Sequence, residues 1–244
     1  MSTTITVEPR FNGPPDSANG GYTCGLLAAA IDGPAEVTLR KPPPLDRAMR
    51  VHRDGGRVLL VDGAELVAEA RPIGPDWSIA PPASIDDARA CVAGSGFLAR
   101  PRAFVSCFVC GPDRPNHDGL SIFPGPLRGR ADVQAGTWMP DRSVAGEDGM
   151  VRPEIVWASL DCPSSGPVGN PPRPDGRVKP IVLARLAADL VAPVPAGREH
   201  VVMAWKIGVD GRKREAGSAL FTSEGQLLAT ARALWIELRD EASA

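Results

Sequence analysis

The sequence predicts an α+β fold of two similar halves, each a long antiparallel sheet around one central helix. Three observations predict it. An apolar hairpin segment occurs twice, each half carries one helix candidate, and 26 glycines with 26 prolines in 244 residues favour strands and turns over a helical bundle. A chain of this length buries a sizeable core without needing a metal or a disulfide.

The repeated segment is a pair of apolar runs joined by a turn that contains glycine. It reads VLLVDGAELVAEARPI over 58–73 and ALFTSEGQLLATARAL over 219–234, and the two copies align without a gap, 161 positions apart (58 and 219). Upstream of both copies, over 39–51 and 190–202, a strand meets a proline cluster and a second strand begins. The shared order of these features predicts an internal duplication.

One helix candidate stands in each half. Residues 19–31 form an apolar stripe behind Asn19, a good N-cap residue, and residues 153–161 begin with Pro153, which suits the first helical position. We expect the second helix to stop at 162–163, where Cys-Pro follows. Strands of the second half are expected over 119–123, 129–138, 180–191 and 199–209.

A proline-rich linker between 74 and 104 separates the halves. It holds one short helix candidate, in which Ser84 and Asp87 form a capping box. We place the boundary near residue 100, so that 1–100 forms the first repeat with the linker and 101–244 forms the second. The long loop over 162–179 is either a binding loop or a tolerated insertion.

Charge and composition argue against several classes of function. Lys and Arg total 27 against 29 Asp and Glu, a net charge of −2, so we expect neither nucleic acid nor an anionic membrane as a partner. No apolar run approaches the ~18–20 residues that span a bilayer, and the start MSTTITVEPR lacks the pattern of a signal peptide. With an odd number of cysteines, five, we expect a cytoplasmic protein with free thiols.

Three segments resemble the tandem, double-hotdog form of the hotdog-fold acyl-CoA thioesterases. FNGPPDSANGGYTCGLL (11–27) looks like that family's lead-in and helix start, and CFVCGPDRPNHDGLSIFPG (107–125) is similar to the opening region of phenylacetate-pathway-type thioesterases. VRPEIVWASLDCPS (151–164) looks like a second central helix with an acidic residue. The resemblance implies two hotdog repeats and an acyl-CoA or other acyl-thioester substrate. We expect no cofactor, and pairing into a homodimer is a further expectation.

Thioester hydrolysis needs fixed donors for the carbonyl oxygen and a group that activates water or attacks directly. Unpaired N–H groups at a helix N-terminus are such donors, and glycine lets a carbonyl approach closely. Asn19, Gly20 and Gly21 have the composition of this oxyanion hole. The simpler interpretation is a turn with an Asn cap.

The resemblance also implies where the acid lies, seven residues after the second glycine of the turn. In the first half this position is Ala28, whereas in the second half the turn is 152–154 and the position is Asp161. We therefore expect one composite site, in which Gly20 and Gly21 polarise the carbonyl and Asp161 positions or activates water, or attacks. The mirror site is expected to be inactive. Alternatively, Asp161 is a carboxylate that merely ends a helix.

Further candidates are weaker. Side chains that could contact substrate are Asn12, Ser164, Ser165 and Trp157. Cations that could meet CoA phosphates are Arg100, Arg102, Arg173 and Lys179. Glu154 could be a second acid, although a Glu in a first helical turn is more simply a partner of the helix dipole.

Cys107-x-x-Cys110 with His117 raises the possibility of a zinc site. A structural zinc site needs four ligands, and no second Cys or His pair stands at metal spacing. We therefore expect no metal and interpret the two cysteines as strand residues of a hotdog repeat.

Two other functions compete with hydrolysis. A hotdog hydratase or dehydratase is disfavoured because that chemistry normally uses an Asp with a His four or five residues on, and neither helix candidate contains a His. A non-catalytic acyl-CoA-binding or regulatory protein remains an alternative. The missing acid in the first half and the missing glycines in the second favour it.

Overall fold

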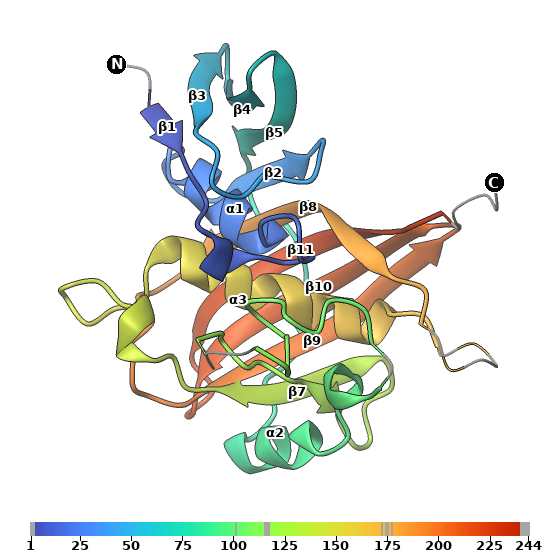
Figure 1. Ribbon diagram of the computed structural model, residues 1–244. Helices are drawn as coiled ribbons and strands as arrows, with labels where there is room; N and C mark the ends of the chain where they lie inside the picture. Colours follow the sequence, from blue (N-terminus) through green and yellow to red (C-terminus); the bar gives the residue numbers. More distant parts are fainter. Residues whose placement is uncertain are drawn as a thin grey trace.

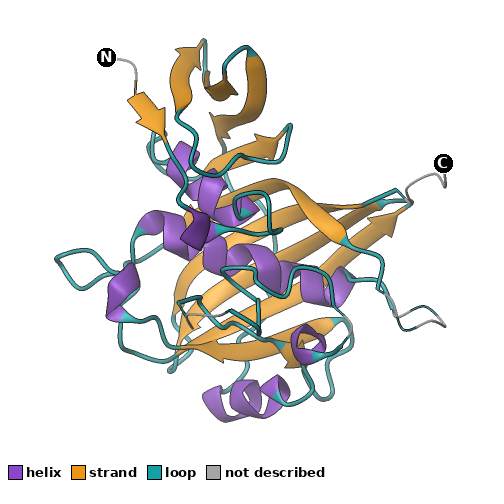
Figure 2. Ribbon diagram, viewed as in Figure 1, coloured by secondary structure: helices purple, strands orange, loops and turns teal. Residues whose placement is uncertain are grey.

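The computed structural model describes residues 3–100, 102–114, 118–171, 173, 176 and 178–239. In this part of the chain one antiparallel sheet of eleven strands wraps around helices (Figures 1 and 2). The helices are α1 (Gly20–Ala28), α2 (Ile85–Val92) and α3 (Pro153–Ser165). The strands are β1 (Thr3–Ile5), β2 (Ala35–Leu39), β3 (Met49–Asp54), β4 (Arg57–Asp62), β5 (Glu65–Pro72), β6 (Gly125–Pro126), β7 (Val133–Trp138), β8 (Ile181–Leu190), β9 (His200–Asp210), β10 (Lys213–Thr222) and β11 (Leu227–Glu237).

The strand order is symmetric about its centre, where β2 pairs with β8. Outward from this pair the order is β5, β4, β3, β1 on one side and β11, β10, β9, β7 on the other, with β6 beyond β7. Each strand of the first half therefore has a counterpart in the second. This is the internal symmetry that the repeated hairpin predicts.

The two equivalent hairpins, β4–β5 and β10–β11, have the same register. Leu60 lies opposite Ala68 and Leu220 lies opposite Ala229, and a bulge follows directly in each hairpin. Positions 60 and 220 differ by 160, whereas positions 68 and 229 differ by 161, so the second turn is one residue longer. Along the first strand of the hairpin, the gapless sequence alignment therefore matches residues that are one position away from their structural equivalents.

Both central helices begin where the sequence predicts, but α1, expected to reach residue 31, ends at Ala28, and α3 ends later than expected. The Asn19 side chain caps α1 by accepting the Tyr22 N–H at 2.9 Å. The expected stop at 162–163 is wrong, since α3 continues through Pro163 to Ser165. The missing N–H of Pro163 removes one helical hydrogen bond, and only Ser164 and Ser165 follow it in the helix.

One of the expected strands is wrong, and another is shorter than predicted. Residues 119–123 run irregularly across the loop before them, where Leu120 N–H donates to Phe108 O and Ile122 N–H to Val109 O. Their apolar pattern reflects burial against this loop and not membership of the sheet. The strand expected over 129–138 begins at Val133, because the chain first turns at Gly129, whose φ is +76°.

The two central helices pack with their backbones in close approach. A Cβ on Gly21 would lie 2.4 Å from the Asp161 Cβ, and a Cβ on Gly25 would lie 2.5 Å from the Glu154 Cα. Only glycine at these two positions permits such a crossing. The crossing places the N-terminus of α1 directly against the second half of α3.

The linker helix α2 packs on the second half of the sheet. Its N-cap is Ser84, which accepts the Asp87 N–H as the capping box predicts. Ala88 and Cys91 lie in a small core cluster with residues of β7, β9 and β10, among them Ala135. The domain boundary at residue 100 stays a prediction.

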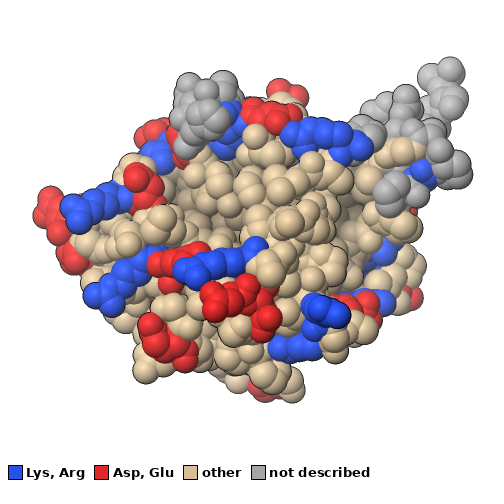
Figure 3. Space-filling view, turned by 90° about the horizontal axis from the view of Figure 1, so that it is seen from below, with Lys and Arg blue, Asp and Glu red and all other residues tan. Residues whose placement is uncertain are grey.

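Two features of the molecule bear on possible partners. None of the described helices has the length and apolar character needed to cross a membrane. On the face shown in Figure 3, Lys and Arg lie beside Asp and Glu without forming one continuous basic area.

Candidate active site

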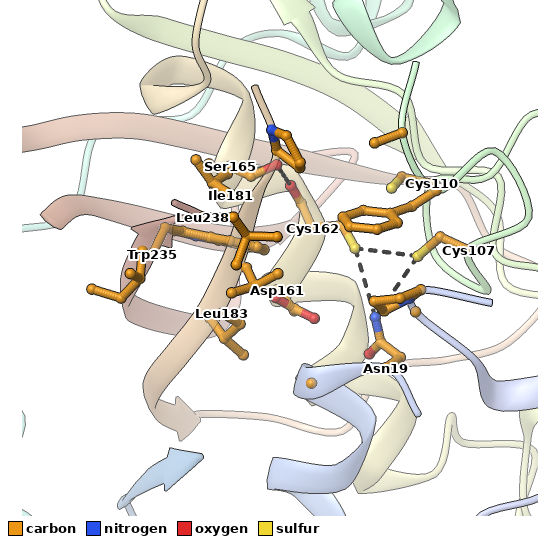
Figure 4. A pocket seen from close by; sticks show the side chains of 18 of the residues that line it. Asn19, Cys107, Cys110, Asp161, Cys162, Ser165, Ile181, Leu183, Trp235 and Leu238 are labelled. Atoms are coloured by element: carbon orange, nitrogen blue, oxygen red, sulfur yellow. Dashed lines mark hydrogen bonds between the residues drawn. The ribbon is translucent and has the colours of Figure 1, made fainter. Parts of the chain in front are cut away.

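A cavity of about 770 Å³ opens where the N-terminus of α1 meets the end of α3. Strands β8 and β11 form one wall, and the segment before β6 forms another (Figure 4). Much of the lining is apolar, including Phe97, Phe104, Ile181, Leu183, Trp235 and Leu238. The polar part of the lining includes Asn19, Gly20, Asp161 and Ser165.

The predicted acid and the predicted glycine turn meet at this cavity, although 140 positions separate them in the chain. The Gly21 N–H donates to Asp161 Oδ2 at 2.8 Å. The Asp161 side chain lines the cavity and is buried, with 2% of its surface exposed. Its other oxygen, Oδ1, has no hydrogen-bond partner among the described residues. One carboxylate oxygen is thus held and the other is available to a molecule in the cavity.

The surroundings of Asp161 favour its protonated form. The pKa of Asp161 is raised from its ordinary value of 3.8 to about 7, mainly by burial and to a smaller extent by negative charge on Cys107. Hydrogen bonds from the Gly21 N–H and the Asn19 side chain lower the pKa and offset part of this effect. The carboxyl group therefore titrates near neutral pH, where a general base is most effective.

The N–H groups that open α1 are divided between the protein and the cavity. The Gly21 N–H bonds to Asp161, and the Tyr22 N–H bonds to the Asn19 cap. Among the residues that the structure describes, the Gly20 N–H has no acceptor, and Gly20 lines the cavity. The donor available to a bound carbonyl is thus that of Gly20, next to the positive end of the α1 dipole.

The weaker substrate candidates are distributed differently. Ser165 lines the cavity, while its hydroxyl donates to Cys162 O at 2.7 Å. Ser164, Trp157 and Asn12 are not among the lining residues. Ser164 is fully buried behind the wall, where its hydroxyl donates to Asp161 O at 2.6 Å and accepts the Trp235 Nε1–H at 2.9 Å.

Trp157 and Asn12 have structural contacts in the core. Trp157 lies at the crossing of the two central helices, where its Cβ would be 2.9 Å from a Cβ on Gly25. Asn12 is buried, and its Oδ1 accepts a hydrogen bond from Arg114 Nη1 at 2.8 Å. Both side chains shape the surroundings of the cavity without reaching it.

Four cationic side chains line the cavity, and the sequence pointed to two of them. Arg102 and Lys179 do so as predicted, whereas Arg100 and Arg173 are not among the lining residues. The other two, Arg40 and Lys41, directly follow β2 in the first half. Both residues directly precede the proline cluster. This position was the one feature of the sequence that could have distinguished them from cations on the outer surface.

Three cysteines also meet at the cavity. The Cys107 and Cys162 sulfurs are 3.6 Å apart, and Cys110 completes a group whose sulfurs all lie within 4.8 Å of one another. Spacing indicated Cys107 and Cys110 but not Cys162, because the third thiol arrives from α3. His117, which the sequence placed with them, lies outside the described residues.

Comparison with known proteins places the fold. No family model matches the chain, and no curated protein matches it. Several solved structures match its fold. A protein of Novosphingobium aromaticivorans assigned as a thioesterase superposes with a TM-score of 0.63 at 14% identity, covering 97% of this chain and 95% of that one. The acyl-CoA thioesterase II TesB2 of Mycobacterium marinum gives 0.58 at 16%, covering 93% and 92%.

A protein of unknown function with a hotdog fold, from Alicyclobacillus acidocaldarius, gives a TM-score of 0.57 at 11% identity, covering 98% of this chain and 93% of that one. The fold is a double hotdog. The predicted fold class, two hotdog repeats each wrapped around a central helix, is therefore confirmed. At these identities the likeness shows the fold, and the chemistry has to be argued from the cavity.

Proposed function

We propose that this chain is a thioester hydrolase that acts on an acyl-CoA or a closely related acyl thioester. The observation that carries the proposal is Asp161 Oδ1, a buried carboxylate oxygen without a partner in the wall of an apolar cavity. A buried polar atom without a partner is costly, so an unpaired one at a cavity indicates a bound water or substrate group.

In the proposed reaction the thioester carbonyl lies against the Gly20 N–H at the start of α1. A water held by Asp161 Oδ1 attacks the carbonyl carbon while the carboxylate accepts its proton. Negative charge then develops on the carbonyl oxygen, where the N–H and the helix dipole stabilise it. The carbon–sulfur bond breaks, the thiolate leaves with the proton from Asp161, and the products are a carboxylic acid and a thiol.

The rest of the lining suits the two ends of such a substrate. Apolar side chains from β8 and β11, such as Leu183 and Trp235, favour an acyl chain over a charged group. Cations on the lining favour the phosphates of CoA; Arg102 is one of them, and its guanidinium lies 4.5 Å from the centre of the Phe97 ring. The acyl-CoA thioesterase assignment of the Mycobacterium marinum structure supports the same substrate class.

The test is to incubate the protein with a panel of straight-chain and aromatic acyl-CoAs and to measure released CoA by chromatography. We expect turnover by the wild type and a loss of about 10²–10⁴-fold in Asp161→Asn, the range typical of a lost general base. The matched control is Asp210→Asn, which changes an exposed Asp at the end of β9 and should leave turnover unchanged.

Two results would contradict the proposal. Equal turnover in wild type and Asp161→Asn would remove Asp161 from the reaction. Thermal stabilisation by acyl-CoA without any released CoA would instead favour the acyl-CoA-binding alternative.

A further inference from the structure

The proposed reaction leaves three buried cysteines at the cavity without a role. Cys107 and Cys110 come from one tight turn, and Cys162 comes from α3 (Figure 4). Each is at most 7% exposed, yet all three line the cavity. Their sulfurs all lie within 4.8 Å of one another.

The groups around the three sulfurs are hydrogen-bond donors. Asn19 Nδ2 lies 3.6 Å from the Cys162 sulfur and 3.9 Å from the Cys107 sulfur, and Arg102 Nη2 lies 3.2 Å from the Cys110 sulfur. Backbone N–H groups at Val109 and Cys110 also donate to Cys107. Such donors stabilise negative charge on sulfur, which metal-bound thiolates carry.

All three cysteines have free thiols, and the Cys107 and Cys162 sulfurs are in contact at 3.6 Å. A thiophilic cation that binds such a group replaces thiol protons with metal–sulfur bonds. The close approach of three sulfurs from two separate segments is the arrangement that such a cation needs.

We propose that Cys107, Cys110 and Cys162 bind a thiophilic divalent cation, Zn²⁺ in the first instance, at the wall of the cavity. A Zn–S bond of about 2.3 Å places the sulfurs of a tetrahedral site about 3.8 Å apart. The Cys107 and Cys162 sulfurs are already 3.6 Å apart, so the ligands need to move little. Water from the cavity completes the tetrahedron.

The turn that carries two of the ligands is held in shape by its own backbone. The Gly111 N–H donates to Cys107 O at 2.8 Å, and a Cβ on Gly111 would lie 2.4 Å from the Cys107 nitrogen. A side chain at position 111 would therefore open the turn. Three thiolates and Zn²⁺ carry a net charge of −1, which Arg102 beside Cys110 offsets.

The test uses the metal alone. Reduced, metal-stripped protein is titrated with Co²⁺, and we expect one ion per chain with the sulfur-to-cobalt charge-transfer band and visible spectrum of a tetrahedral site; Zn²⁺ should then displace it. Cys110→Ser and Cys162→Ser should each weaken binding at least tenfold, since loss of even an outer-shell partner costs about 10–100-fold. The control is Cys91→Ser, a buried cysteine on α2 outside the cluster.

A second measurement keeps the test independent of whether these variants fold. In zinc-loaded wild type, titration with a mercurial reagent should release the metal in step with the modification of three thiols. The proposal is overturned if the reduced wild type binds no Co²⁺, if binding is unchanged in folded Cys110→Ser and Cys162→Ser, or if mass spectrometry of protein purified without a reductant finds Cys107 and Cys162 joined as a disulfide.

Discussion

At the scale of single residues, two glycines of α1 determine whether the candidate site exists. Gly20 leaves an N–H for the cavity, and Gly21 lets α3 approach closely enough for its N–H to bond Asp161. A Cβ on Gly21 would lie 2.4 Å from the Asp161 Cβ and 2.9 Å from Trp157 O. The glycine turn that the sequence indicates as an oxyanion hole is therefore also a packing requirement.

This requirement predicts the effect of Gly21→Ala. The added methyl has to push α1 away from α3, so we expect a loss of about 1–3 kcal/mol in the free energy of unfolding, as overpacked sites show. Released CoA should fall in parallel, because the bond to Asp161 lengthens. Urea denaturation measures the first effect. Gly56→Ala is the control, since a Cβ there meets no atom within 4 Å, and equal stability of both variants would contradict the prediction.

Asp161 should make stability depend on pH. The pKa of Asp161 is raised from 3.8 to about 7 on folding, so the folded state binds the proton more tightly than the unfolded state. The tighter proton binding stabilises the folded state fully below pH 4, and this stabilisation is lost as pH rises to 7. The free energy of unfolding should fall by an amount of the order of 4 kcal/mol over this range. Asp161→Asn should flatten this slope and be more stable than wild type at pH 8. Denaturant midpoints of chelator-treated proteins across this range check it, and parallel slopes would refute it.

The site shows which residues could be predicted from the sequence. The glycine turn was indicated by its local composition and Asp161 by the resemblance to the hotdog thioesterases, and the structure brings the two together at the cavity. Cys162 and Arg40 reach the cavity through tertiary structure, and no local pattern connects either of them with Asp161. Asn12 stands in a segment resembling a known motif, but a buried bond to Arg114 occupies its side chain. Local sequence does not contain that information.

At the scale of elements, periodicity predicted the strands that lie inside the sheet better than those at its edge. β8 and β9 lie within one residue of their expected bounds, because long apolar strands paired on both sides show a clear pattern. The segment over 119–123 is equally apolar but packs under a loop, which periodicity cannot distinguish from a strand. The end of α3 was also predicted wrongly from a local signal. The sequence marks Pro163 as a helix stop, but proline is compatible with a last helical turn.

The end of β11 is tied to its surroundings by charge, which gives a second pH prediction. Hydrogen bonds from Lys179 and Arg214 lower the pKa of Glu237 to about 2. The stabilisation from these pairs is therefore present above about pH 4.5 and is lost as pH falls through 2. Glu237→Gln should be less stable than wild type at pH 6, and the difference should vanish towards pH 2. Thermal melts of both proteins at several pH values test this, and a difference that persists at pH 2 would contradict it.

At the scale of the whole molecule, the duplicated halves form one body. The central pair β2–β8 makes the sheet continuous, and one core cluster contains Val37 of the first half together with Leu186 of the second. The cavity depends on this union, because α1 supplies the N–H and α3 supplies the carboxylate. Neither half contains the candidate site by itself.

A continuous core predicts that the chain unfolds in a single cooperative step. Of the five tryptophans only Trp77 precedes the second half, so tryptophan fluorescence reports mainly on residues 138–235. Val37→Ala removes buried methyl groups from the first half, at the seam where Val37 lies opposite Leu186. We expect a loss of roughly 1–3 kcal/mol. The fluorescence and far-ultraviolet circular dichroism midpoints should both shift, and by the same amount. If the fluorescence midpoint stays in place while the dichroism shifts, the two halves unfold separately, and the shared cavity could then open by local separation of α1 from α3.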